Sequence, residues 1–93
     1  MDYSEDLLKK IKELAESLTP PQEIAALTGL NELTLMYDIN TPDNPARIAF
    51  MQGYSATALK LRKQNLELTD AGSPAADDAC RSYMRRMLRD IDL

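Results

Sequence analysis

The 93-residue sequence has few of the residues that enzymes use for chemistry. It contains no histidine, and its one cysteine, Cys80, can form no internal disulfide and has no imidazole to activate it as a nucleophile. Its three glycines form no phosphate-binding loop, and no set of residues has metal-ligand spacing. We therefore expect a non-enzymatic protein that uses no cofactor and no metal.

Long apolar runs and excess positive charge are missing too. The first residues, MDYSEDLLKK, begin acidic and are not continuously apolar, so we expect neither a secretory signal nor a membrane anchor. A net charge of -4 argues against a general nucleic-acid coat, which presents excess Lys and Arg to phosphate. We expect a cytoplasmic protein that does not bind a membrane.

Apolar residues recur with a helical period, and Pro and Gly divide the chain into five such segments. None alternates with a period of two long enough to predict a strand. The predicted fold is all-α and forms a single domain over residues 1–93. It consists of an N-terminal three-helix unit with a helix-turn-helix at 1–40, followed by a long antiparallel helical hairpin at 45–93, which we expect to mediate oligomerisation.

The helix-turn-helix prediction rests on residues 21–39, PQEIAALTGLNELTLMYDI. Ile24 and Ala25 should pack inward, and Gly29 should end the first short helix in a left-handed conformation. Three apolar residues should anchor the second helix: Leu30, Leu35 and Ile39. Such a unit is most often found in DNA-binding proteins, where the second helix enters the major groove.

The second helix of this unit is acidic. Its predicted polar surface consists of Asn31, Glu32, Thr34 and Asp38, and no Lys or Arg occurs between positions 22 and 46. Asn31, Glu32 and Thr34, near the helix start, are the candidates for base contacts, because Asn pairs with adenine and Glu accepts from cytosine. The phosphate contacts that position a protein on DNA are missing from this helix. A helix-turn-helix that contacts another protein is therefore an open alternative.

Phosphate contacts could come from the hairpin. Arg81, Arg85 and Arg89 are spaced by four and form one row on a helix, and Lys60 and Lys63 lie on the preceding helix. Guanidinium groups can hold phosphates bidentately. The alternative is a solvated row that pairs with acids such as Glu67 or Asp70, or with a neighbouring subunit.

The hairpin carries more apolar residues than one short domain can cover. We predict buried positions at Leu61 and Leu68 on its first helix and at Met84, Met87 and Ile91 on its second. Some of this surface should be subunit contact, so a homo-oligomer is expected. The candidate interface residues are aromatic or methionine: Phe50, Tyr54, Tyr83, Met84 and Met87.

Three short motifs follow the segment EIAALTGL in a characteristic order. They are the aromatic-x-x-Gly of Phe50 to Gly53, the pair Leu61-Arg62, and the turn Gly72-Ser73-Pro74. This order, over about Pro21 to Met84, resembles small phage or prophage proteins of the terminase small-subunit type. The resemblance implies recognition of viral double-stranded DNA and assembly as a ring or other oligomer beside a large packaging subunit. The acidic second helix departs from that pattern.

The expected function is a phage-type DNA-binding and packaging adaptor in which oligomerisation adds up weak DNA contacts. The alternative is a helical protein-interaction adaptor whose helix-turn-helix does not bind DNA. A prophage transcriptional regulator would need a two-fold dimer that presents both second helices about one DNA turn apart.

Overall fold

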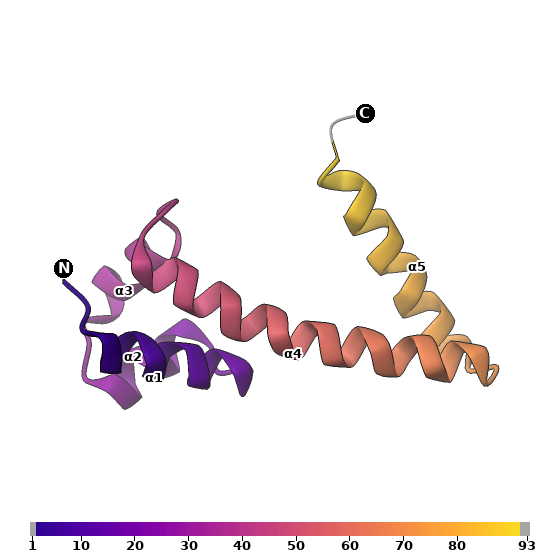
Figure 1. Ribbon diagram of the computed structural model, residues 1–93, viewed down its shortest axis with the longest axis horizontal. Helices are drawn as coiled ribbons and strands as arrows, with labels where there is room; N and C mark the ends of the chain where they lie inside the picture. Colours follow the sequence, from indigo (N-terminus) through magenta and orange to yellow (C-terminus); the bar gives the residue numbers. More distant parts are fainter. Residues whose placement is uncertain (1, 92–93) are drawn as a thin grey trace. The chain divides into compact units, whose positions relative to one another are not determined.

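The computed structural model describes residues 2–91, and all of its regular elements are helices. Their order along the chain is α1 (Glu5–Glu16), α2 (Pro21–Thr28), α3 (Glu32–Ile39), α4 (Pro45–Asp70) and α5 (Pro74–Arg89) (Figure 1). No strand occurs in this range, which confirms the all-α prediction. The first residue of the predicted domain and residues 92 and 93, the predicted end of the hairpin, lie outside the described part.

The helix ends follow local sequence chemistry. The hydroxyl of Ser4 accepts a hydrogen bond from the Leu7 amide at 3.1 Å and caps α1. Gly29 ends α2 with a φ of 75°, as predicted, because glycine has no Cβ to oppose a left-handed conformation. Before α4, the Asn44 side chain accepts from the Ala46 amide at 2.9 Å. Ser73 caps α5, with Pro74 at its first position.

The chain divides into two compact units, residues 1–57 and 58–93, and the boundary falls inside α4. We call them unit 1 and unit 2. The sequence analysis predicted a boundary between the two modules in the loop at 40–45. The boundary between the units lies later in the chain because the first half of α4 packs on α1. The Thr57 hydroxyl donates to the Glu16 carbonyl, and Gly53 is buried.

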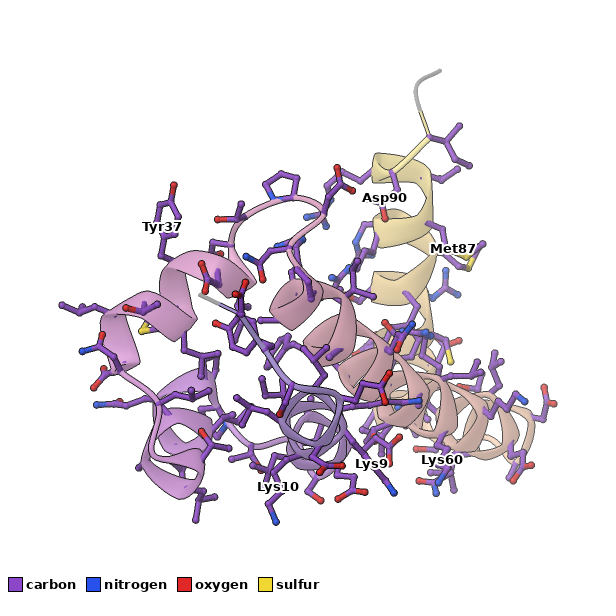
Figure 2. The ribbon with its side chains drawn as sticks, turned by 60° about the vertical axis from the view of Figure 1, so that its left-hand side comes forward. Lys9, Lys10, Tyr37, Lys60, Met87 and Asp90 are labelled. Carbon is purple, nitrogen blue, oxygen red and sulfur yellow. The ribbon has the colours of Figure 1, made fainter. Side chains whose placement is uncertain are left out.

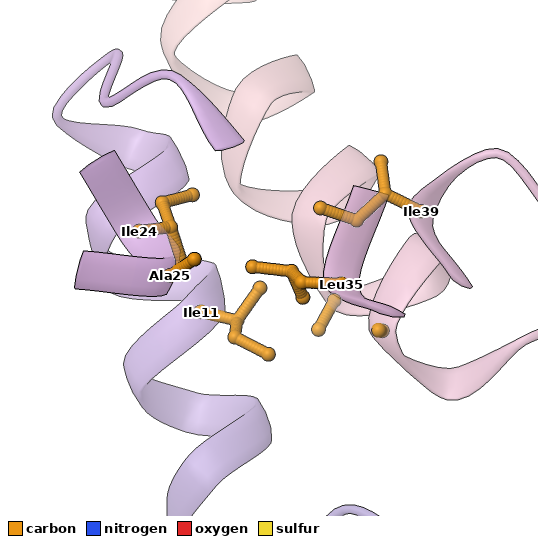
Figure 3. Packing of buried hydrophobic residues seen from close by; sticks show 7 residues of the cluster. Ile11, Ile24, Ala25, Leu35 and Ile39 are labelled. Atoms are coloured by element: carbon orange, nitrogen blue, oxygen red, sulfur yellow. The ribbon is translucent and has the colours of Figure 1, made fainter. Parts of the chain in front are cut away.

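Unit 1 has a closed core to which α1, α2, α3 and the start of α4 contribute. Ile11, Ile24 and Leu35 are completely buried, and Figure 3 shows these side chains converging with Ala25 and Ile39. The predicted inward positions of the helix-turn-helix are therefore confirmed, with Leu30 packed at the edge of this cluster.

Gly53 allows α1 and α4 to approach closely. A Cβ at this position would lie 2.1 Å from the Lys12 carbonyl oxygen and 2.9 Å from the Ala15 Cβ. Both distances are shorter than van der Waals contact, so any larger residue would push the two helices apart. The Gly of the aromatic-x-x-Gly motif thus has a packing role in unit 1.

Unit 2 has a small buried surface. Only Ala76 and Cys80 are buried among its described residues. Two side-chain contacts join α4 to α5: Asn65 donates to the Tyr83 hydroxyl at 2.8 Å, and the Thr69 hydroxyl lies 3.4 Å from the Cys80 Sγ. These contacts lie within three turns of the connecting loop. Antiparallel packing along the remainder of the predicted hairpin stays a prediction.

Five positions that the sequence analysis expected to be buried are exposed. They are Leu61, Leu68, Met84, Met87 and Ile91. The physical reason is geometric: two helices joined by a tight turn cover one stripe on each other, and no third element of unit 2 covers the rest.

Candidate nucleic-acid and subunit interface

Asn31 caps α3. Its side-chain Oδ1 accepts a hydrogen bond from the Thr34 amide at 2.9 Å, and Thr34 itself is half-buried. A bidentate contact to adenine uses the oxygen and the amino group of Asn together, so base reading by Asn31 would compete with capping. Glu32 follows at the first helical position and is exposed, where its charge complements the helix dipole.

Asp38 does not belong to the polar surface of α3, contrary to the sequence analysis. It is only 7% exposed, and the Tyr3 hydroxyl donates to its Oδ2 at 2.5 Å. Burial raises the pKa of the Tyr3 phenol, and its hydrogen bond to Asp38 and the negative charge of that carboxylate raise it further. The pair fastens the segment before α1 to α3.

The outward face of α3 is mainly apolar. Leu33 and Tyr37 are 79% and 73% exposed, and Met36 is partly exposed beside them. Figure 2 shows the Tyr37 ring standing clear of the helix. Exposed Leu, Met and Tyr on one helix face are typical of protein contacts, whereas phosphate contacts need cations or hydrogen-bond donors.

The candidate cations all lie in unit 2 and are accessible. Lys60 and Lys63 are exposed on α4, and Arg81, Arg85 and Arg89 are exposed on α5. The base-contact candidates Asn31, Glu32 and Thr34 all lie in unit 1. The structure thus assigns the two halves of the predicted DNA interface to different units.

Arg81 has an acidic partner on its own helix. Its Nε donates to Asp77 Oδ2 at 3.0 Å, and this hydrogen bond, with the charge of Asp77, raises the pKa of the guanidinium group. The sequence analysis had named Glu67 and Asp70 as possible partners of the arginine row. In residues 2–91 no other salt bridge forms, so Arg85 and Arg89 keep their donors available.

The candidate subunit-contact residues differ in accessibility. The Phe50 and Tyr54 rings stack with centroids 6.5 Å apart and an interplanar angle of 6°, and Phe50 also packs against the core of unit 1. Tyr83 is half-buried and accepts from Asn65. Met84 and Met87 are exposed, and Figure 2 shows Met87 projecting away from α5. The two methionines are therefore the most accessible of the five.

The sequence analysis did not select a pair of grooves beside α4. Pro42, Arg47 and Met51 line one groove, and Leu8, Lys9 and Lys12 line the other. The sequence feature that could have predicted these grooves is a second stripe on the long helix, at positions 48, 51, 52 and 55. This stripe has helical spacing and lies outside the buried stripe.

No group of three or more His, Cys, Asp or Glu side chains in residues 2–91 could hold a metal ion. Within the same range, no helix combines the length and the apolar character needed to cross a bilayer.

The chain was compared with models of known protein families, with curated proteins and with solved structures, and none of the three comparisons gave a match.

Proposed function

We propose that the protein is a non-enzymatic DNA-binding and packaging adaptor of the phage terminase small-subunit type. The observation that carries the proposal is that one chain combines two different units. Unit 1 contains the helix-turn-helix and has a buried core, whereas the two helices of unit 2 leave most of their large apolar side chains exposed. This pairing suits a division of labour in which unit 1 docks and unit 2 assembles copies. The order of motifs from Pro21 to Met84 supports the same assignment.

Self-association would use the apolar surface of unit 2. Large apolar side chains are exposed on both of its helices: Leu59, Leu61, Leu66 and Leu68 on α4, and Met84, Met87 and Leu88 on α5. Covering such side chains between subunits removes apolar surface from water, at about 25 cal/mol per Å². The proposed partner for this surface is a second copy of the chain, which makes the protein a homo-oligomer.

DNA contact would be weak in each subunit and add up over the oligomer. Arg85 and Arg89 supply donors for phosphate, while α3 supplies no cation. Several subunits on one duplex convert weak single contacts into strong binding, because later contacts form at high effective concentration. A large packaging subunit is the proposed protein partner of this assembly.

A protein-interaction adaptor is the second candidate, and the exposed Leu33 and Tyr37 on α3 favour it. In this alternative, α3 packs on another protein and the helix-turn-helix does not contact DNA. Both candidate functions include a homo-oligomer, and they differ in whether unit 1 binds DNA or another protein.

The test measures solution mass and retention of duplex DNA at low and high salt. We expect an oligomer that retains DNA at low salt and releases it at high salt, because phosphate contacts weaken with ionic strength. Arg85→Glu with Arg89→Glu should abolish retention, and Lys10→Glu with Lys12→Glu, which changes the net charge by the same amount, is the control on α1. Met84→Asp with Met87→Asp should lower the mass.

A monomer at every concentration together with no DNA retention at low salt would exclude the packaging adaptor. An oligomer that never retains DNA would favour the protein-interaction adaptor, and Leu33→Ser with Tyr37→Ser should then abolish partner capture without changing the mass.

A further inference from the structure

Two neighbouring grooves lie along the first half of α4, both within unit 1. One has a volume of about 520 Å³ and the other, between α1 and α4, of about 410 Å³. Ile48 and Gln52 line both, so the two grooves adjoin each other along this helix. Grooves between packed helices are a common docking place for an amphipathic helix of a partner.

The floor of this double groove is apolar. Ile48 is 49% exposed and Met51 37% exposed, and the half-buried Leu8 adds apolar surface. Ile48 and Met51 belong to a stripe with Gln52 and Ser55 that is separate from the buried stripe of α4. The groove is therefore not an unfilled part of the core, and covering it would bury apolar side chains that now contact water.

The rim of the double groove is positively charged, although the chain has a net charge of -4. Lys9 and Lys12 line it from α1 and are exposed, and Arg47 lines it from α4. Asp43 is the one acidic residue among the described residues that line it. Figure 2 shows Lys9 and Lys10 projecting from α1 into solvent.

The Arg47 side chain already has one intramolecular partner, because its Nη1 donates to the Ile39 carbonyl at 2.8 Å. Lys9 and Lys12 form no salt bridge with an acid in the described part of the chain. Lys9 and Lys12 lie one turn apart on α1 and can meet two acidic side chains one turn apart on a docked helix.

We infer that this groove binds an acidic amphipathic helix of a partner protein. The apolar floor would receive side chains spaced i, i+3, i+4 and i+7, and Lys9 and Lys12 would pair with flanking Glu or Asp. Nucleic acid fits less well, because a phosphate backbone offers nothing to cover Ile48 and Met51. This inference goes beyond the proposed function and does not depend on DNA binding.

A second copy of the chain is a poorer match by charge. In a second copy, the acidic helix α3 exposes Leu33, Met36 and Tyr37, but these span only i to i+4 and leave the i+7 position unfilled. Longer exposed apolar faces lie on α4 and α5, and α5 carries Arg81, Arg85, Arg86 and Arg89. These arginines would face the lysines of the rim with like charge. α1 is acidic, but its apolar stripe faces the core of unit 1.

The experiment selects peptides from a displayed library against the full chain. The library holds amphipathic helices of about 18 residues, roughly five turns, with fixed Leu and Ile positions and the flanking positions varied among Glu, Lys, Gln and Ser. We expect the selected peptides to be enriched in Glu. Labelled peptides should bind saturably and shift the amide signals of residues around Ile48, Met51 and Lys12.

Lys9→Glu with Lys12→Glu should weaken binding of the selected peptides by roughly tenfold or more, because two ion pairs become repulsions. Lys9→Glu and Lys12→Glu made singly should each weaken binding, and Lys10→Glu is their matched control. Lys10 is exposed on the same helix and does not line the groove, so this variant should leave affinity unchanged. Ile48→Ser should also weaken binding, which a purely electrostatic attraction would not explain.

Three results would overturn the inference. The first is peptide binding that does not depend on the charge of the rim. It would show as selection without enrichment in Glu, or as an equal effect of the single Lys9, Lys10 and Lys12 substitutions on affinity. The second is a lower solution mass of the Lys9→Glu/Lys12→Glu variant, which would identify a second copy as the occupant. The third is loss of duplex DNA retention in that variant with unchanged peptide affinity, which would make the lysines phosphate contacts.

Discussion

Unit 1 and unit 2 are built from similar helical patterns but differ in how much they bury. In unit 1, Ile11, Ile24 and Leu35 are each 0% exposed, whereas in unit 2 the buried described residues are the small side chains Ala76 and Cys80. Unit 1 draws its core from four helices, whereas unit 2 has one helix pair in its described part, residues 58–91. An amphipathic pattern thus predicts a helix, while burial requires enough neighbouring elements to surround its apolar stripe.

The largest expected effect comes from the same truncation made in each unit. Leu35→Ala should lower the free energy of unfolding by about 2–5 kcal/mol, because it leaves a cavity in a closed core. Leu61→Ala should change it by about 0.5 kcal/mol or less in the monomer, because Leu61 is 43% exposed. Urea unfolding followed by circular dichroism measures both. Equal losses would mean that unit 2 has a core of its own.

An intermediate effect is expected from the hydrogen bond between Tyr3 and Asp38 in unit 1. Tyr3→Phe should cost about 1–3 kcal/mol, because it leaves the buried Asp38 carboxylate without its donor. Tyr37→Phe is the matched control on an exposed ring and should have almost no effect. Urea midpoints at neutral pH compare the two variants.

Burial of the Tyr3 phenol, together with its hydrogen bond to Asp38, makes the stability of unit 1 sensitive to high pH. The folded chain raises the pKa of Tyr3 above its ordinary value of 10.0, so the phenol keeps its proton more tightly in the folded state. This contribution is complete below pH 10.0 and is lost as the pH rises further, so unfolding becomes easier at high pH. Tyr3→Phe should flatten that part of the pH profile, and an unchanged slope would contradict the assignment.

The smallest expected effect concerns the helix cap of unit 2. Ser73→Ala removes the acceptor for the Ala76 amide at 3.3 Å and should destabilise α5 by about 0.5–1 kcal/mol. Ser82→Ala, within the same helix and exposed, is the control. Hydrogen exchange should accelerate at α5 amides and stay unchanged in unit 1. Acceleration in both units would show that they unfold together.

Much of the fold could be predicted because it depends on local chemistry. Gly29, Asn44 and Ser73 mark helix ends through backbone conformation or a side-chain acceptor, which need only neighbouring residues. The buried positions of the helix-turn-helix were also predictable, because the short helices have one apolar face each.

The candidate site was less predictable because it depends on contacts distant in sequence. Asp38 has the position of a surface residue on α3, and only the packing of Tyr3, 35 residues earlier, makes it a buried acceptor. The pairing of Asp77 with Arg81, by contrast, could have been predicted from the sequence, because the two residues lie four apart on one helix; only acids of the facing helix or of a neighbouring subunit were considered.

The sequence by itself determined five helices, their caps and the left-handed turn at Gly29, because each follows from residues within a few positions of one another. Only the tertiary structure decided which apolar stripes are covered, where α4 passes from unit 1 to unit 2, and that Ile48 and Met51 line a groove edged by Lys9 and Lys12. The physical reason is that burial and charge environment are set by neighbours in space, which helical periodicity alone does not specify.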